Sequence, residues 1–319
     1  MKRSDLKKGL TFGIIGVFLI GFQPIIANSR PEIIDPYIFA AITALIEAII
    51  FLPIYVFERK RLRSMLLENY PKNNISLNLL LNGWKKKSNI KLLIVIGFTF
   101  SIVPILLYIG YELAGAILSS LVLKSEVIFA LFFGYIILKE EKISKVQVIF
   151  CSLLFLGLII AITQGSFNIL EFNAGVLILI INVALFTLIH TLTKSAFDRN
   201  ELFPTQIVFI RNLLSGILLI STYILIFSFD HLYTFFKFEY FVFFLLMGID
   251  YGLSLFFWYK TLTYIEIGKA GIINSLTPIV SSFFAFIILK EDFTIFHLLG
   301  TIIVIFSIYM IMSKKKVNF

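Results

Sequence analysis

The chain has 319 residues, of which 59% are hydrophobic and only 15% are charged, and its mean hydropathy is +0.96. A soluble domain has roughly 25% charged residues and must keep its surface wet, so this composition excludes a water-soluble fold and indicates a protein dissolved in lipid. The formal net charge is +9, and three scattered histidines and one cysteine disfavour a metal centre or a disulfide framework.

The first eight residues contain four Lys and Arg residues and precede an apolar run that starts at Gly9. This arrangement superficially resembles a secretory signal peptide. The run is nevertheless long enough to cross a bilayer, and no cleavage site of the small-x-small type follows it. We therefore expect residues 1–8 to be a cytoplasmic flank and the run to remain as the first span.

Ten apolar runs are long enough to cross the hydrocarbon core of a bilayer, which takes about 20 residues in a helix. They are residues 9–28, 36–57, 91–111, 116–138, 145–164, 174–194, 204–228, 239–259, 267–289 and 294–312. Only residues 112–115 divide the third run from the fourth, but one helix over both would be far too long. The sequence therefore predicts an all-α polytopic membrane protein with ten transmembrane helices.

One sizeable segment, residues 58–90, lies outside the predicted spans. It is basic at both ends, and an apolar stretch at 75–81, followed by Trp84, lies between them. Two interpretations remain open, namely a short amphipathic helix on the inner leaflet and a disordered basic linker.

The distribution of Lys and Arg predicts the orientation. With the N-terminus in the cytoplasm, the cytoplasmic segments hold 23 of the 28 Lys and Arg residues, and the outer segments hold three. Positive charge gathers on the cytoplasmic side of membrane proteins, so this asymmetry supports ten spans with both termini in the cytoplasm. The net charge is therefore an orientation signal and does not imply a nucleic-acid partner. The expected partners are the lipid bilayer and a small-molecule substrate.

The two halves of the chain contain a repeated segment. Residues 132–141 and 283–292 share a Phe-Phe pair and a Leu-Lys-Glu end at a constant offset of 151. Five spans per half is an odd number, so the halves cross the membrane in opposite directions, as in the inverted repeats of transporters. We expect a first repeat over 9–164, a second over 174–312 and a basic cytoplasmic tail over 313–319.

The repeated Leu-Lys-Glu end is expected to have a structural role. Its glutamate is placed to cap the N-terminus of the following helix, and Ser144 and Thr294 are the candidate N-cap residues there.

These features resemble the EamA branch of the drug/metabolite transporter superfamily. Residues 277–291 run from Thr-Pro-Ile to Leu-Lys-Glu as the family pattern does, and residues 124–140 follow it except that Val127 replaces the proline. Arg211 follows Pro204 with the family's spacing, although the first half lacks such an arginine. The resemblance implies a ten-span permease that works by alternating access without ATP hydrolysis. It leaves open a substrate among amino acids, nucleotide sugars, sugar phosphates and drugs.

Ionisable side chains inside the predicted spans are candidate substrate-binding or ion-binding groups, since each costs roughly 2.5–3.5 kcal/mol to place at mid-bilayer. They are Glu47, Lys124, Glu126, Asp250 and Arg211. In the functional interpretation, Lys124 binds an anionic group of the substrate, and Glu47 or Asp250 binds a proton or an amine. The alternatives are mutual neutralisation, for example of Lys124 by Glu47, and snorkelling to the lipid surface. For Arg211 the structural role is favoured.

Neutral polar residues inside the spans form a second group of candidates. Prolines at 24, 104 and 278 can interrupt their helices, and nearby polar side chains can then line a cavity. The candidates are Gln23, Asn182, His190 and Asn274. The alternative role of each is a hydrogen bond between helices, which is the commoner one.

The sequence contains no G-x-x-x-x-G-K-[ST], H-E-x-x-H, C-x-x-C or G-x-S-x-G motif. We expect no catalytic residues, cofactor or metal. The favoured function is a secondary transporter of a small polar metabolite in the cell membrane, either proton-coupled or an exchanger. The alternatives are a nucleotide-sugar or sugar-phosphate exchanger of the same fold, an intramembrane enzyme acting on lipids, and a non-transporting receptor or scaffold.

The topology is testable with reporter fusions. A reporter that is active only in the cytoplasm is expected to be active at the C-terminus, because ten crossings return the chain to its starting side. The same reporter fused after Lys237, in a predicted outer segment, is the control and is expected to be inactive. An external C-terminus would contradict the ten-span prediction.

Overall fold

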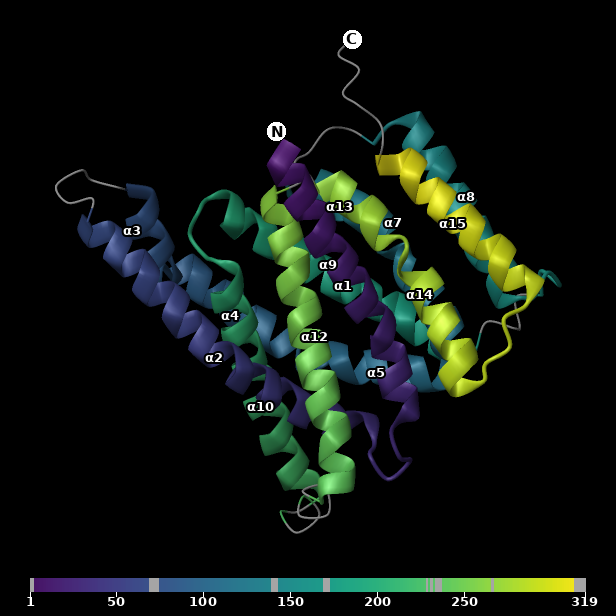
Figure 1. The fold of residues 1–319 in the computed structure, drawn as a ribbon, viewed down its shortest axis with the longest axis horizontal. Coiled ribbons are helices and arrows are strands. Elements are labelled where there is room, and N and C mark those ends of the chain that lie inside the picture. The colour runs from purple at the N-terminus through teal and green to yellow at the C-terminus, as the bar shows by residue number, and fades with distance from the viewer. Residues whose placement is uncertain are drawn as a thin grey trace. The chain divides into compact units, whose positions relative to one another are not determined.

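The structure of the protein is a computed structural model, and its described part comprises residues 3–68, 75–138, 143–168, 173–227, 229, 232, 237–264 and 267–312. Within these ranges the chain is helical and contains no β-strand (Figure 1). The elements are α1 (Arg3–Ser29), α2 (Pro36–Glu68), α3 (Ile75–Asn82), η1 (Gly83–Lys85), α4 (Lys87–Thr99), α5 (Val103–Ala114), α6 (Ala116–Val122), η2 (Leu123–Ser125), α7 (Glu126–Ile137), α8 (Lys145–Ile162), α9 (Ala174–Asp198), α10 (Pro204–Phe227), α12 (Phe238–Tyr264), α13 (Ile267–Asn274), α14 (Thr277–Phe284), η5 (Ala285–Leu289) and α15 (Ile295–Met312).

The predicted spans are present as helices. In the described ranges, nine helical stretches are long and apolar enough to cross a membrane, and a tenth apolar helix over Ile295–Ile311 is somewhat shorter. These ten coincide with the ten predicted runs, so the all-α polytopic fold is confirmed. Residues 139–142, which include the first Leu-Lys-Glu end, and the tail at 313–319 lie outside the described residues.

Helix α2 is longer than predicted. The span was expected to end at residue 57, but the helix continues to Glu68. The residues that follow Phe57 include Arg, Lys, Leu and Met, which favour helix, and Arg59 Nη1 donates to the Tyr55 hydroxyl one turn earlier at 2.7 Å. A helix of 33 residues is about 50 Å long and exceeds the roughly 30 Å hydrocarbon core. Its charged end therefore extends past the apolar region.

The segment between the second and third spans contains the predicted short helix, α3. Leu81 on this helix is buried, whereas Ile75 is 70% exposed. The disordered-linker alternative is wrong for residues 58–68 and 75–90, which are almost entirely helical. Residues 69–74 lie outside the described part, and the placement of α3 on a leaflet stays a prediction.

Three of the predicted spans are interrupted. The third is divided into α4 and α5 at residues 100–102, just before Pro104, and the ninth is divided into α13 and α14 just before Pro278. Proline lacks an N–H and clashes with the preceding turn, which explains both breaks. The fourth span changes from α6 to the 3₁₀ turn η2 and then to α7 without a proline. Pro24, in contrast, lies within a continuous helix α1.

The helices form two compact units, and each unit contains parts of both sequence repeats. The first unit comprises Met1–Arg30, Leu106–Thr187 and Leu253–Phe319, and the second comprises Pro31–Ile105 and Leu188–Gly252. In the first unit α8 and α15 lie side by side (Figure 1). In the second unit α2 packs along α10, and Gly216 permits the contact, since a Cβ there would lie 2.7 Å from the Leu45 side chain.

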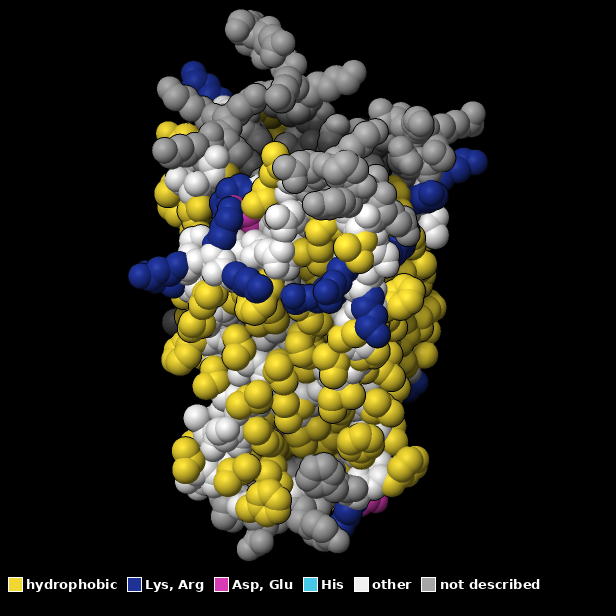
Figure 2. Space-filling view, turned by 90° about the vertical axis from the view of Figure 1, so that its left-hand side faces the viewer, with side chains coloured by type: hydrophobic (Ala, Val, Ile, Leu, Met, Phe, Trp, Pro, Cys, Tyr) yellow, Lys and Arg dark blue, Asp and Glu magenta, His cyan; other side chains and the backbone are white. Residues whose placement is uncertain are grey.

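Large apolar side chains on the spans point away from the protein. Examples are Ile49, which is 70% exposed, and Leu225, which is 84% exposed. Figure 2 shows one face, on which hydrophobic side chains form a broad belt and Lys and Arg side chains gather along one edge of it. An apolar belt bordered by cations is the surface expected of a protein surrounded by lipid.

Glu291, in the second Leu-Lys-Glu segment, caps a helix that was not the expected one. Its carboxylate accepts hydrogen bonds from the backbone N–H groups of Ala116 at 2.7 Å and Ile117 at 3.0 Å, at the start of α6. Gly115 precedes them with φ +78°, a left-handed conformation that suits glycine. The following helix, α15, is capped instead by Thr294, which accepts from the His297 N–H at 3.3 Å.

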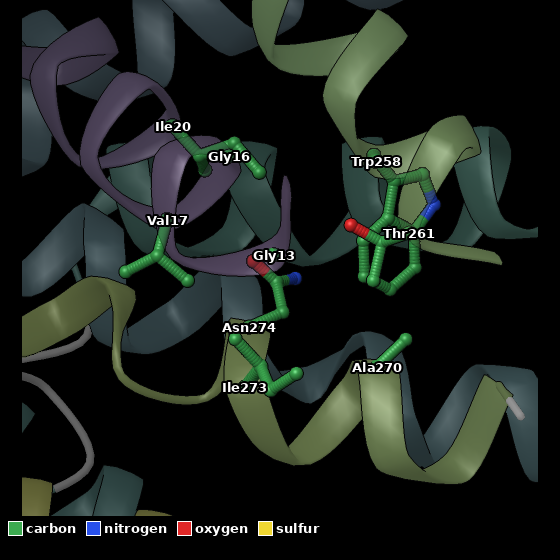
Figure 3. A pocket seen from close by; sticks show the side chains of 9 residues that line it. All are labelled: Gly13, Gly16, Val17, Ile20, Trp258, Thr261, Ala270, Ile273 and Asn274. Carbon is green, nitrogen blue, oxygen red and sulfur yellow. The ribbon is translucent and has the colours of Figure 1, made fainter. Parts of the chain in front are cut away.

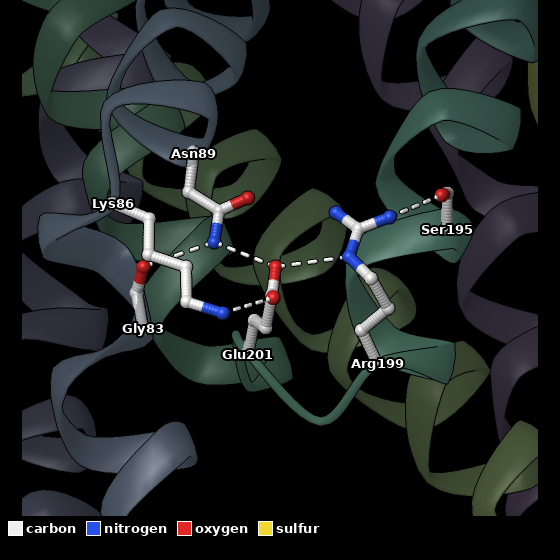
Figure 4. Close-up of polar contacts among 6 residues, drawn as sticks. All are labelled: Gly83, Lys86, Asn89, Ser195, Arg199 and Glu201. Carbon is white, nitrogen blue, oxygen red and sulfur yellow. Dashed lines mark hydrogen bonds and ion pairs between the residues drawn. The ribbon is translucent and has the colours of Figure 1, made fainter.

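Glu201 anchors the turn between α9 and α10 in the second unit (Figure 4). Its carboxylate is 8% exposed and accepts from Lys86 Nζ at 2.6 Å, Asn89 Nδ2 at 2.9 Å and Arg199 Nε at 3.0 Å. The hydrogen bonds from Lys86 and Asn89 lower the pKa of Glu201 from 4.5 to about 2, even though burial opposes the shift. The turn is therefore tied to the start of α4 by a carboxylate that is ionised at neutral pH.

Replacement of Glu291 tests the cap on α6. Glu291→Ala is expected to lower the free energy of unfolding by about 1–2 kcal/mol, because two backbone donors lose their acceptor. Thermal unfolding in detergent measures the change. The exposed neighbour Asp292 provides the control, and an equal loss in Asp292→Ala would contradict the assignment.

The Glu201 anchor predicts a pH dependence of stability. The folded protein binds a proton at Glu201 less tightly than the unfolded chain, so the stabilisation is complete above about pH 4.5 and is lost as the pH falls towards 2. Glu201→Gln should reduce the dependence of the unfolding temperature on pH in this window. Glu239→Gln, at an exposed position, is the control, and an identical pH profile in wild type and Glu201→Gln would refute the prediction.

Candidate functional site

Two interrupted spans in the first unit are broken at equivalent positions of the repeat. Helix α7 begins at Glu126 and α14 begins at Thr277, which are 151 residues apart, the same offset as the Leu-Lys-Glu segments. Helix α6 packs against α14. Discontinuous helices at corresponding positions of two repeats are a feature of transporter binding sites.

A hydrogen bond links the two breaks. Asn274 Nδ2, at the end of α13, donates to Glu126 Oε1 at 3.0 Å, and Thr277 Oγ1 donates to the Asn274 backbone carbonyl at 2.7 Å. Two of the candidates selected from the sequence, Glu126 and Asn274, are therefore in direct contact. Together with Lys124 and Ser125 they are called the broken-helix cluster below.

Lys124 lies in η2 and is only 3% exposed. Glu126 is the charged group that acts on it electrostatically. Among the described residues the Lys124 ammonium has no ion-pair partner within 4.0 Å and no hydrogen-bond partner, and the buried Ser125 hydroxyl also lacks a partner there. The break in the fourth span thus holds a buried cation whose donors are unused.

A small cavity lies beside Asn274 in the first unit (Figure 3). Residues of α1, α12 and α13 line it, including Gly16, Trp258 and Ile273. Its volume of about 10 Å³ is enough for about one water molecule and far below the roughly 300–1,000 Å³ of ligand pockets. In this conformation the cavity therefore does not admit a metabolite.

Gln23 is also buried in the first unit, where its amide Nε2 donates to the Ser254 hydroxyl at 2.9 Å. Asn182 is fully buried, but its side-chain amide meets no hydrogen-bond partner among the described residues. The structure therefore places Gln23 in a contact between helices, as the structural alternative predicts, and brings Asn182 into no described polar contact.

A second group of buried charges lies in the second unit. Asn212 Nδ2 donates to Glu47 Oε2 at 2.6 Å and its Oδ1 accepts from Arg211 Nε at 2.9 Å, while Arg211 Nη2 lies 3.5 Å from the same Glu47 oxygen. Arg211 is 2% and Glu47 4% exposed. These three residues, with His190, are called the arginine cluster below.

Aromatic rings enclose the guanidinium of Arg211. Its Cζ lies 4.2 Å from the centroid of the Phe100 ring and 5.7 Å from that of Tyr251. The His190 ring stacks on Phe100 at 6.2 Å. A planar cation held by a carboxylate, an amide and two rings has little freedom to move.

Asp250 on α12 is 7% exposed, and Glu47 acts on it electrostatically as a like charge. No described residue donates a hydrogen bond to its Oδ2 atom. Glu47 is thus compensated by Asn212 and Arg211, whereas Asp250 has no comparable donor.

The candidates therefore fall into two separate sets. Lys124, Glu126 and Asn274 belong to the first unit, and Glu47, His190, Arg211 and Asp250 belong to the second. Glu47 is paired with Arg211, not with Lys124 as suggested for the neutralising alternative. The sequence analysis did not select Asn212 or Phe100 as candidates. Asn212 could have been selected, because it is an amide directly after Arg211 within an apolar run.

The described residues contain no group of three or more His, Cys, Asp and Glu side chains that could hold a metal ion. The polar groups that are present suit hydrogen bonding and charge compensation of a bound molecule.

Comparisons with known proteins are consistent with this architecture. A solved structure described only as "Crystal structure of protein" matches 95% of this chain and 96% of its own, with a TM-score of 0.62 and 12% identity, which shows a common fold. No curated protein matches the sequence. The model of the EamA-like transporter family matches residues 7–163 and again residues 173–313. The chain therefore belongs to the EamA-like transporter family and is a multi-pass membrane protein.

Proposed function

We propose that the protein is a secondary transporter that moves a small polar metabolite with an anionic group across the membrane by alternating access. The observation that carries this proposal is Lys124, a buried cation without a hydrogen-bond partner among the described residues, in the break of the fourth span. In this proposal the broken-helix cluster contacts the substrate, Lys124 binds its anionic group, and Asn274 and Ser125 hydrogen-bond its polar atoms.

The energetics of burial support a ligand at Lys124. An ionised ammonium in an apolar interior is costly unless it is paired and hydrogen-bonded. Glu126 offsets part of the charge, but it also accepts from Asn274. An anionic substrate group would supply the missing acceptors, and the N-terminal end of α14, which begins at the break before Pro278, also favours negative charge.

The small cavity beside Asn274 supports a mechanism in which the site must open. A metabolite cannot occupy about 10 Å³, so it requires a conformation in which the helices around the break separate. Two inverted repeats provide two such openings, one towards each side of the membrane. We propose the cell membrane as the location, with both termini in the cytoplasm, on the basis of the Lys and Arg asymmetry.

The energy source is proposed to be a proton gradient or exchange. The sequence has no phosphate-binding loop of the P-loop type, and ionisable groups inside the spans are the usual elements of ion coupling. A nucleotide-sugar or sugar-phosphate exchanger is the second candidate, because Lys124 would also bind a phosphate. An intramembrane lipid enzyme is disfavoured, since members of the family are transporters.

The substrate can be identified by thermal shift of the purified protein against a library of metabolites. A ligand present at 100 times its dissociation constant stabilises the native state by about 2.7 kcal/mol. If the protein transports a small polar metabolite without phosphate, carboxylate compounds should raise the unfolding temperature. If it is a nucleotide-sugar or sugar-phosphate exchanger, phosphorylated compounds should do so. In Lys124→Ala the shift should disappear, because the anionic group loses its cation.

Uptake of the identified compound provides the functional test. Lys124→Ala, Glu47→Gln and Asp250→Asn are each expected to lose uptake at normal abundance in the membrane. Lys87→Ala, which removes an exposed lysine outside the described clusters, is the matched control and should transport normally. Unaltered uptake in all three variants would refute the proposed site.

A further inference from the structure

We propose that the basic end of the second unit binds the headgroup of an anionic phospholipid, with Arg59, Trp84 and Lys85 as the contact residues. Arg59 follows the apolar part of α2 by two residues, and the other two lie in η1, just before α4. This site faces lipid on the side of the membrane that is expected to be cytoplasmic. It does not depend on the proposed transport function.

The Trp84 ring brings two cations together. Arg59 Cζ lies 5.8 Å and Lys85 Nζ 5.9 Å from the centroid of this ring, and Arg59 Nη1 donates to the Tyr55 hydroxyl at 2.7 Å. The ring is half-buried and packs against an apolar core that includes Leu93. Because the ring is held in place, its cation–π contacts position both charges before a ligand binds.

The two cations have no acidic partner in the part of the chain that the structure describes. Its ion pairs include neither Arg59 nor Lys85, and the adjacent Glu58 accepts a hydrogen bond from a hydroxyl of α10 instead. Lys86, in contrast, is paired with Glu201. The surface around Trp84 therefore keeps a positive charge that an anion can compensate.

The lipid-facing stripe of α2 leads directly to these cations. Leu52 and Val56 are exposed apolar residues one turn apart, and the exposed Lys60 follows one turn later. Residues four apart lie on the same face of a helix. The apolar stripe thus ends in a cation beside Arg59, at the boundary where a helix leaves the hydrocarbon core.

Helix α4 shows the same order of residues from its other end. The exposed Lys91 is followed on the same face by Ile94 and Phe98, which are also exposed. Figure 2 views the side of the molecule on which α2 and α3 lie in Figure 1, and Lys and Arg side chains border the apolar belt there. Cations and apolar side chains therefore form one continuous surface.

This continuity favours a phospholipid over a soluble partner. A phosphate headgroup at the boundary can contact the cations while its acyl chains lie along the apolar stripes, so one molecule uses both parts of the surface. A nucleic acid or an acidic protein would cover only the cations. Tryptophan also prefers the boundary between membrane and water, and each Lys or Arg near an anionic membrane strengthens binding about fivefold.

The fluorescence of Trp84 can report on the bound lipid. Trp258→Phe leaves Trp84 as the single tryptophan of the chain, and this full-length variant is reconstituted in phosphatidylcholine vesicles. Phosphatidylglycerol with brominated acyl chains, which quench tryptophan at short range, is expected to act at a mole fraction at least about fivefold lower than brominated phosphatidylcholine does. Equal quenching by the two lipids would overturn the proposal.

Variants in the same background assign the site. Arg59→Gln and Lys85→Gln are each expected to weaken the preference for phosphatidylglycerol about fivefold, and the double variant should lose it. Lys237→Gln, which removes an exposed lysine from a predicted outer segment, is the matched control and should keep the preference. A preference that survives in the double variant, or that falls equally in Lys237→Gln, would contradict the assignment.

Soluble anions distinguish a lipid from other ligands of the same surface. Glycerophosphoglycerol has the headgroup of phosphatidylglycerol without its acyl chains, and heparin is a soluble polyanion. Neither contacts the apolar stripes, so neither is expected to reverse the quenching by brominated phosphatidylglycerol at physiological salt. Reversal by either compound would show that the surface binds soluble anions, and the proposed lipid site would be wrong.

Discussion

Charge buried away from water must be compensated within the protein, and the polar interior of this chain is organised by that requirement. Glu47 accepts a hydrogen bond from Asn212 and pairs with Arg211, and Glu126 accepts a hydrogen bond from Asn274. These pairs join helices far apart in the sequence, because lipid offers no alternative partner. Lys124 and Asp250 are the two buried ionisable groups with the fewest compensating partners among the described residues, which is why the functional argument depends on them.

The fold was largely predictable from the sequence, because its main determinants are local and additive. About 20 apolar residues make a span wherever they occur, and the bias of Lys and Arg accumulates along the chain. The breaks before Pro104 and Pro278 follow from the chemistry of one residue each. The repeat was visible in the Leu-Lys-Glu ends, and the family model matches twice, once in each half.

The contacts of the candidate site were not predictable in the same way, because they join distant segments. The sequence shows Glu47 and Arg211 as buried charges but contains no signal that they pair. Glu291 was expected to cap the following helix, yet it caps α6, since a carboxylate binds whichever N-terminus the packing brings near. The break at η2 lacks a proline, so no single residue in the sequence predicts it. The extension of α2 beyond Phe57 reflects helix propensity together with contacts such as the hydrogen bond from Thr205 to Glu58 at 2.6 Å.

The two repeats share their backbone plan but not their charges. Lys124 and Glu126 in the first repeat correspond at the offset of 151 to Ser275 and Thr277 in the second, and Asp250 corresponds to Thr99. The break is therefore present in both repeats, whereas Lys124, Glu126 and Asp250 have no ionisable counterpart in the other repeat. A duplicated break lets two halves change conformation in equivalent ways, but a charge present in only one copy can hold a ligand in one orientation. In the transport mechanism proposed above, the symmetry of the fold provides the movement, and the asymmetry of the side chains provides recognition of the substrate.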